Sequence, residues 1–79
     1  MGKYNIELVT MQDCNDFVSA VSKCDGKIIL ESADGFRVNG KSLIGALASM
    51  EWDKLYCISE RDIYNKIERW IVNDYQEDL

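Results

Sequence analysis

The sequence predicts a small α+β domain in which helices cover one face of a single antiparallel sheet. Segments of alternating apolar and polar residues, typical of half-buried strands, are interspersed with segments whose apolar residues recur at helical spacing. An Asp34-Gly35 pair between two alternating segments is typical of a tight hairpin turn. Because 79 residues leave room for one domain only, we expect residues 1–79 to fold around one core.

The first half of the chain is expected to form a strand, a helix and a hairpin. Thr10 and Asp13 have the spacing of a capping box, and the apolar residues that follow them recur at helical spacing. Gly26 then provides a helix stop. The expected elements are a strand at residues 3–9, a helix at residues 12–24, and paired strands at residues 27–32 and 36–39.

The second half is expected to add a helix, a strand and a helix. Ser42 has a side chain suited to cap a short helix. Residues 51–59 favour a strand, because apolar and polar residues alternate in their second half. Ser59 to Asp62 have the spacing of a second capping box, which would start a helix that extends to about residue 74. The predicted order is therefore βαββαβα, a four-stranded antiparallel sheet with three helices on one face.

Composition excludes several classes of function. The formal net charge of −5 offers no basic face for nucleic acid, and no apolar run is long enough to span a membrane. The three cysteines, Cys14, Cys24 and Cys57, are odd in number and widely spaced, which fits neither a disulfide framework nor a zinc site. We therefore expect a cytoplasmic monomer without a metal or cofactor.

Four short segments carry a family resemblance. They are Ser22-Lys-Cys-Asp25, Leu30-Glu31, Lys41-Ser42 followed by a hydrophobic residue and Gly45, and Leu55-Tyr-Cys-Ile-Ser59. In order, they resemble the end of the first helix, the second strand, the start of the short second helix and the last strand of HPr, the phosphocarrier of the bacterial sugar phosphotransferase system (PTS). The resemblance covers about residues 4–72. It implies an HPr-like open-faced β-sandwich.

The chain departs from this family at the residue that carries the phosphoryl group. An HPr is phosphorylated on a histidine in a loop of the form Gly-Ile/Leu-His-Ala-Arg-Pro-Ala, and this chain contains no histidine. The corresponding segment here, residues 9–14, is several residues shorter than the family's loop and also lacks its arginine and proline. Histidyl phosphotransfer is therefore excluded, and we expect a protein that is not an enzyme.

The resemblance also implies a regulatory role for Ser42. In Gram-positive members of the family, an ATP-dependent kinase phosphorylates the matching serine, and the product binds a regulator of catabolite repression. A phosphate at a helix N-terminus would meet free backbone N–H groups and the positive end of the helix dipole. The alternative is that Ser42 is simply a good N-cap.

The residues around Ser42 suggest a docking surface. If Leu43, Ala46 and Met50 face the sheet, Ile44 and Leu47 point to solvent, where they match the family's exposed docking positions. Lys41 adds a cation beside them. Exposed aliphatic side chains rimmed by polar groups are typical of protein-recognition sites, although scattered exposed hydrophobics are also common.

Three functional hypotheses follow. The first is a PTS-related regulatory module that binds HPr kinase/phosphorylase, a catabolite regulator or other PTS components, with or without phosphorylation of Ser42. The second is a thiol-based carrier or enzyme that uses Cys14, because a helix N-terminus lowers a thiol pKa. The third is a degenerate paralogue with no retained PTS role.

Overall fold

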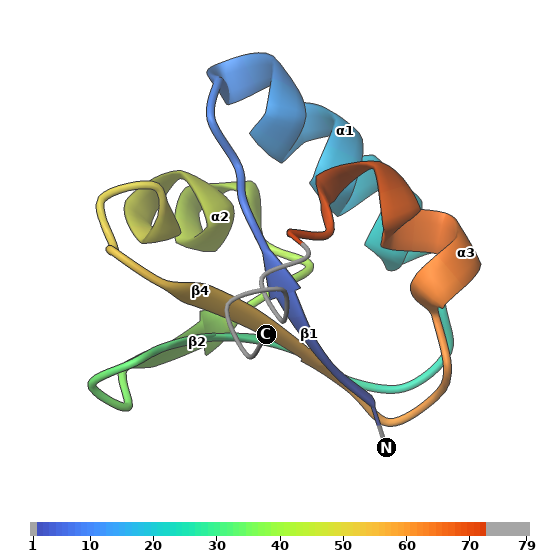
Figure 1. Ribbon diagram of the computed structural model, residues 1–79. Coiled ribbons are helices and arrows are strands. Elements are labelled where there is room, and N and C mark those ends of the chain that lie inside the picture. Colours follow the sequence, from blue (N-terminus) through green and yellow to red (C-terminus); the bar gives the residue numbers. More distant parts are fainter. Residues whose placement is uncertain (1, 73–79) are drawn as a thin grey trace, which may run out of the picture.

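Four strands form one antiparallel sheet, and the helices lie on one face of it (Figure 1). The computed structural model describes residues 2–72. In chain order the elements are β1 (Gly2–Ile6), α1 (Met11–Ser22), β2 (Ile28–Ser32), β3 (Arg37–Asn39), α2 (Leu43–Ser49), β4 (Leu55–Ser59), α3 (Tyr64–Ile67) and the 3₁₀ turn η1 (Glu68–Trp70). The predicted βαββαβα order and antiparallel sheet are confirmed.

The strands follow the spatial order β1-β4-β2-β3. The register places Leu30 of β2 opposite Cys57 of β4 on one side and opposite Val38 of β3 on the other. The end of β1 pairs with the chain after η1, where Ile71 forms a bridge with Ile6. The first and last described elements therefore hold each other in place.

The core lies between the sheet and the helices. Every second residue of β2 and β4 is buried, as the alternating pattern predicted. Helix α1 contributes Phe17, whose ring meets that of Trp70 edge to face, with 5.5 Å between the centroids and 79° between the planes. This pair joins α1 to the end of the described chain.

The strand predicted over residues 51–59 begins only at Leu55. The backbone N–H groups of Glu51 and Trp52 donate to the carbonyls of Ala48 and Ser49, at 3.4 and 3.1 Å. These groups continue the turn at the end of α2 and do not enter the sheet. The prediction was therefore wrong for residues 51–54 and correct for residues 55–59.

The capping box predicted from Ser59 to Asp62 does not form. Ser59 is the last residue of β4, and its hydroxyl accepts a hydrogen bond from the N–H of Arg61 at 3.1 Å. Helix α3 begins later, at Tyr64, with no side chain capping it. Ser59 is paired with Gly2 and Ile28 in the sheet, and its hydroxyl binds the N–H of Arg61, two residues on, instead of the N–H of Asp62 that a capping box requires.

The last helix is also shorter than predicted. After η1, Ile71 is extended, and the N–H of Val72 donates to the carbonyl of Asn5 at 2.8 Å. Pairing with β1 therefore replaces the end of the helix that was expected to reach about residue 74. Residues 73 and 74 of that prediction lie outside the described residues. Within residues 2–72, no helix has the length and apolar character needed to cross a membrane.

Candidate functional site

Ser42 caps α2, as the sequence predicted. Its Oγ accepts a hydrogen bond from the N–H of Gly45 at 3.2 Å, and its own N–H donates to the carbonyl of Asn39 at 3.1 Å. The neighbouring Lys41 donates from its ammonium group to the carbonyl of Cys24, at 2.7 Å. Lys41 therefore ties the turn before α2 to the chain that follows α1, while the half-exposed Ser42 holds the helix start.

The outward face of α2 differs in part from the predicted one. Ile44 is 80% exposed, as expected. Leu47, also expected in solvent, is only half-exposed and packs against the core, whereas Leu43, expected to face the sheet, is exposed. The docking candidates of α2 are therefore Leu43 and Ile44, with Leu47 at their edge.

Small residues on the inward face explain this rotation. Ala46 and Ser49 are buried, and a Cβ atom on Gly45 would lie 2.8 Å from the carbonyl oxygen of Asn39 and 3.3 Å from the Cβ of Val38. The absence of a side chain at position 45 lets α2 lie close to β3. The space beside Gly45 is therefore filled by β3 of the same domain.

Gly45→Ala is expected to destabilise the domain by about 1–2 kcal/mol, because crowding against the Asn39 backbone outweighs the gain in helix propensity. Urea unfolding followed by circular dichroism measures the change. The control is Ala48→Gly, at an exposed position of the same helix, which should cost about 1 kcal/mol from propensity alone. A rise in stability for Gly45→Ala would contradict the close contact.

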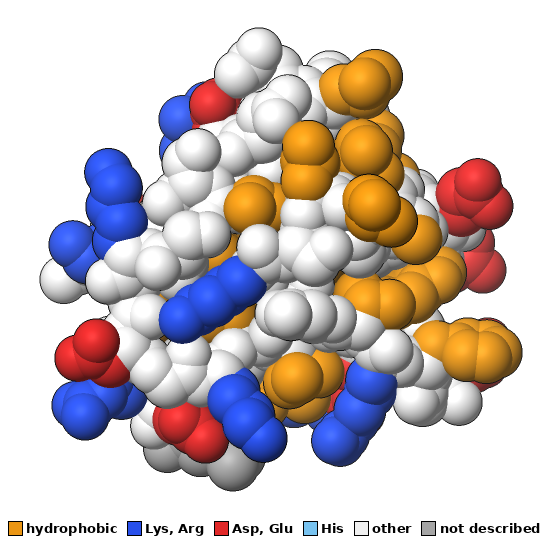
Figure 2. All heavy atoms as spheres, turned by 180° about the vertical axis from the view of Figure 1, so that it is seen from behind, with side chains coloured by type: hydrophobic (Ala, Val, Ile, Leu, Met, Phe, Trp, Pro, Cys, Tyr) orange, Lys and Arg blue, Asp and Glu red, His pale blue; other side chains and the backbone are white. Residues whose placement is uncertain are grey.

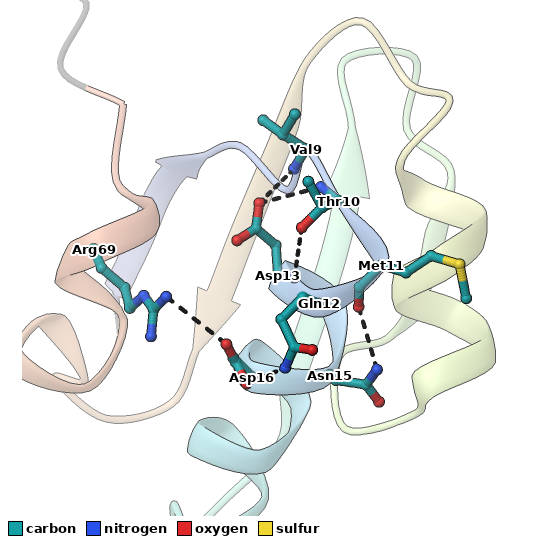
Figure 3. Close-up of polar contacts among 8 residues, drawn as sticks. All are labelled: Val9, Thr10, Met11, Gln12, Asp13, Asn15, Asp16 and Arg69. Atoms are coloured by element: carbon teal, nitrogen blue, oxygen red, sulfur yellow. Dashed lines mark hydrogen bonds and ion pairs between the residues drawn. The ribbon is translucent and has the colours of Figure 1, made fainter.

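The loop before α1 is fixed by the predicted capping box (Figure 3). The Asp13 carboxylate accepts hydrogen bonds from the N–H groups of Val9 and Thr10, at 3.0 and 3.2 Å, and the Asp13 N–H donates to Thr10 Oγ1 at 3.0 Å. These bonds hold Val9 and Met11 on the surface, where 63% and 65% of each is exposed. In Figure 3 the side chain of Met11 extends toward α2.

The same carboxylate gives the fold a specific dependence on pH. The N–H groups of Val9 and then Thr10 are the main causes that lower the pKa of Asp13 below its ordinary value. A lowered pKa in the folded state stabilises the fold above the unfolded pKa, and this contribution is lost as the pH falls through the folded pKa. The relevant range lies below about pH 4.

We therefore expect Asp13→Asn to be less stable than the wild type at neutral pH, and the difference to shrink as the pH falls below about 4. Urea unfolding at a series of pH values tests this. Asp53→Asn, which removes the charge of an exposed carboxyl, is the matched control. A difference that stays constant across the series would show that the charge of Asp13 contributes nothing.

Behind this loop, polar contacts attach α1 to η1. The guanidinium of Arg69 lies 3.7 Å from the Asp16 carboxylate and 4.9 Å from the centre of the Trp70 ring. The Gln12 amide donates to the other oxygen of Asp16 at 2.9 Å (Figure 3). These contacts fix the orientation of α1, and hence of its exposed first turn.

Together these elements form one apolar surface. We use this name for the side chains that the start of α1, α2 and the adjoining loops present: Val9, Met11, Leu43, Ile44, Leu47, Met50, Trp52 and Phe36. Figure 2 shows hydrophobic side chains gathered in a band over α2 and the start of α1. Of these residues, only Ile44 and Leu47 were predicted for docking. The sequence feature that could have indicated Met11 is that it is apolar but lies outside the buried stripe of its helix.

Two of the three thiols, those of Cys14 and Cys57, are buried. Cys14 is fully buried, its Sγ donates to the carbonyl of Ala46 at 3.6 Å, and burial, followed by the charge of Asp13, raises its pKa. Burial likewise raises the pKa of Cys57, to about 12. A buried, neutral thiol is a poor nucleophile, so the geometry disfavours the hypothesis that Cys14 is a reactive group.

Within residues 2–72, no three metal-ligating side chains come together. Comparison with known protein families, with curated proteins and with solved structures finds no match. The fold and the apolar surface are therefore the features that bear on function.

Proposed function

We propose that the chain is an HPr-like, non-enzymatic module of the PTS that binds a protein partner through the apolar surface. The βαββαβα order and the helices on one face of the sheet support the relationship, since they are what the resemblance implies. The observation that carries the docking role is Ile44, 80% exposed on α2 beside the exposed start of α1. Contiguous exposed apolar side chains favour a recognition site.

The proposal assigns no phosphocarrier step to the chain. The sequence contains no histidine, and the N–H groups of Val9, Thr10 and Asp13 at the start of α1 already bind the protein's own Asp13 carboxylate and Thr10 hydroxyl. The partners are HPr kinase/phosphorylase, a catabolite regulator or other PTS components. A cytoplasmic location belongs to the same proposal, and the three free cysteines favour it.

Phosphorylation of Ser42 is the regulatory part of the proposal. The residue is half-exposed and directly precedes Leu43 and Ile44, so a phosphate there would add about two negative charges at the edge of the apolar surface. Incubation with ATP and an HPr kinase, followed by intact-mass measurement, tests this. We expect one phosphate, which Ser42→Ala abolishes; no phosphate on the wild type would leave Ser42 as a helix cap only.

Capture of partners tests the docking function itself. We expect the wild-type protein, immobilised in a lysate of its source cell, to retain a partner that Ile44→Asp does not retain, since a buried aspartate would be desolvated without a counter-charge. Tyr64→Asp is the matched control, because Tyr64 is an exposed hydrophobic residue on α3, outside the apolar surface. Equal retention by wild type and Ile44→Asp would refute the proposal.

A further inference from the structure

The apolar surface is bordered by acidic side chains at one end of the sheet. Trp52 lines two hollows, one of about 430 Å³ and one of about 270 Å³. The first is lined by Val9 and Met50, and the second by Phe36. Among the described residues that line the two hollows, the one cation is Lys54. Four are carboxylates, called the rim carboxylates below: Glu7, Asp34, Glu51 and Asp53. Figure 2 shows acidic side chains along the outer margin of the hydrophobic band.

Several of the cations elsewhere in the described chain are already engaged. Lys3 and Arg37 both pair with Glu31 on the opposite face of the sheet, at 3.6 and 2.8 Å. Lys41 donates to the carbonyl of Cys24, and Arg69 pairs with Asp16. Within residues 2–72 no ion pair involves any of the four rim carboxylates, so their charge is available to a partner.

We infer that the partner docks with a segment in which large apolar side chains are flanked by lysine or arginine. The apolar side chains cover Met11, Ile44 and Trp52, and the cations meet the rim carboxylates. Complementary charge around an apolar centre speeds association and excludes partners with an acidic rim. This inference rests on the proposed function and specifies the chemistry of the partner at the same surface.

Two synthetic amphipathic peptides with one shared leucine stripe test the inference. One carries lysine at the flanking positions and the other carries glutamate. We expect the lysine peptide to bind at least about tenfold more tightly at low salt, with the difference shrinking as sodium chloride screens the rim. The triple variant Asp34→Lys, Glu51→Lys, Asp53→Lys should reverse the preference, whereas Asp25→Lys with Glu68→Lys, at exposed sites outside the apolar surface, should not.

Non-specific attraction between a basic peptide and an acidic protein gives a different result. Ile44→Asp adds a negative charge, so attraction by charge alone would tighten binding of the lysine peptide, whereas docking on the apolar surface requires that binding weaken. Equal affinity for the two peptides, no binding of either, or a preference that survives the triple variant would overturn the inference. The docking function would still stand if Ile44→Asp lost the captured partner, so the two failures are distinguishable.

Discussion

Phe17→Ala is expected to lower the midpoint of thermal unfolding by about 15–30 °C. Phe17 is fully buried and packs edge-on against Trp70, so its removal leaves a cavity between α1, the sheet and η1. Such truncations cost about 3–5 kcal/mol, and in a domain of this size each kcal/mol corresponds to about 4–8 °C. Thermal unfolding followed by circular dichroism measures the shift.

The chain's other phenylalanine provides the control. Phe36 is 65% exposed in the turn between β2 and β3, and Phe36→Ala should change the free energy of unfolding by less than about 1 kcal/mol. Comparable losses for the two variants would mean that the core is not centred on the Phe17–Trp70 pair.

Met11→Asp is expected to weaken binding of the captured partner by about thirtyfold, or roughly 2 kcal/mol, without loss of fold stability. Met11 is the first residue of α1, where an aspartate interacts favourably with the helix dipole. The same carboxylate would have to lose its water to enter the contact with the partner. Isothermal titration calorimetry gives the affinity, and thermal unfolding gives the stability.

Ser19→Asp adds the same charge to an exposed position later in α1 and should leave the affinity unchanged. Full affinity in Met11→Asp, together with loss in Ile44→Asp, would confine docking to α2 and exclude the start of α1.

The elements that could be predicted from the sequence have local causes. The capping box of Thr10 and Asp13 starts α1, and Gly35, with a φ of 97°, closes the turn between β2 and β3. The last helix could not be predicted, because what shortens it is distant in the sequence. Pairing of Ile71 with Ile6 keeps the chain extended there, and no local pattern reports that contact.

The apolar surface could be predicted only in part, for a similar reason. Ile44 follows from the helical register of α2. The sequence does not indicate that Leu43 is exposed while Leu47 packs against the core. The inward face of α2 consists of small residues, and Gly45 and Ala46 add little to the hydrophobic pattern of the helix. Met11 joins the surface through the packing of α1 beside α2, which is a tertiary contact.

The most direct test of the docking proposal is amide hydrogen exchange of the domain, alone and bound to the captured partner. We predict that binding slows exchange at residues 9–11 and 43–52, where the apolar surface lies. The open face of the sheet provides the internal comparison, since Ile29, Tyr56 and Ile58 are only half-buried there. Slowed exchange confined to the strands that carry these three residues would contradict docking through α1 and α2.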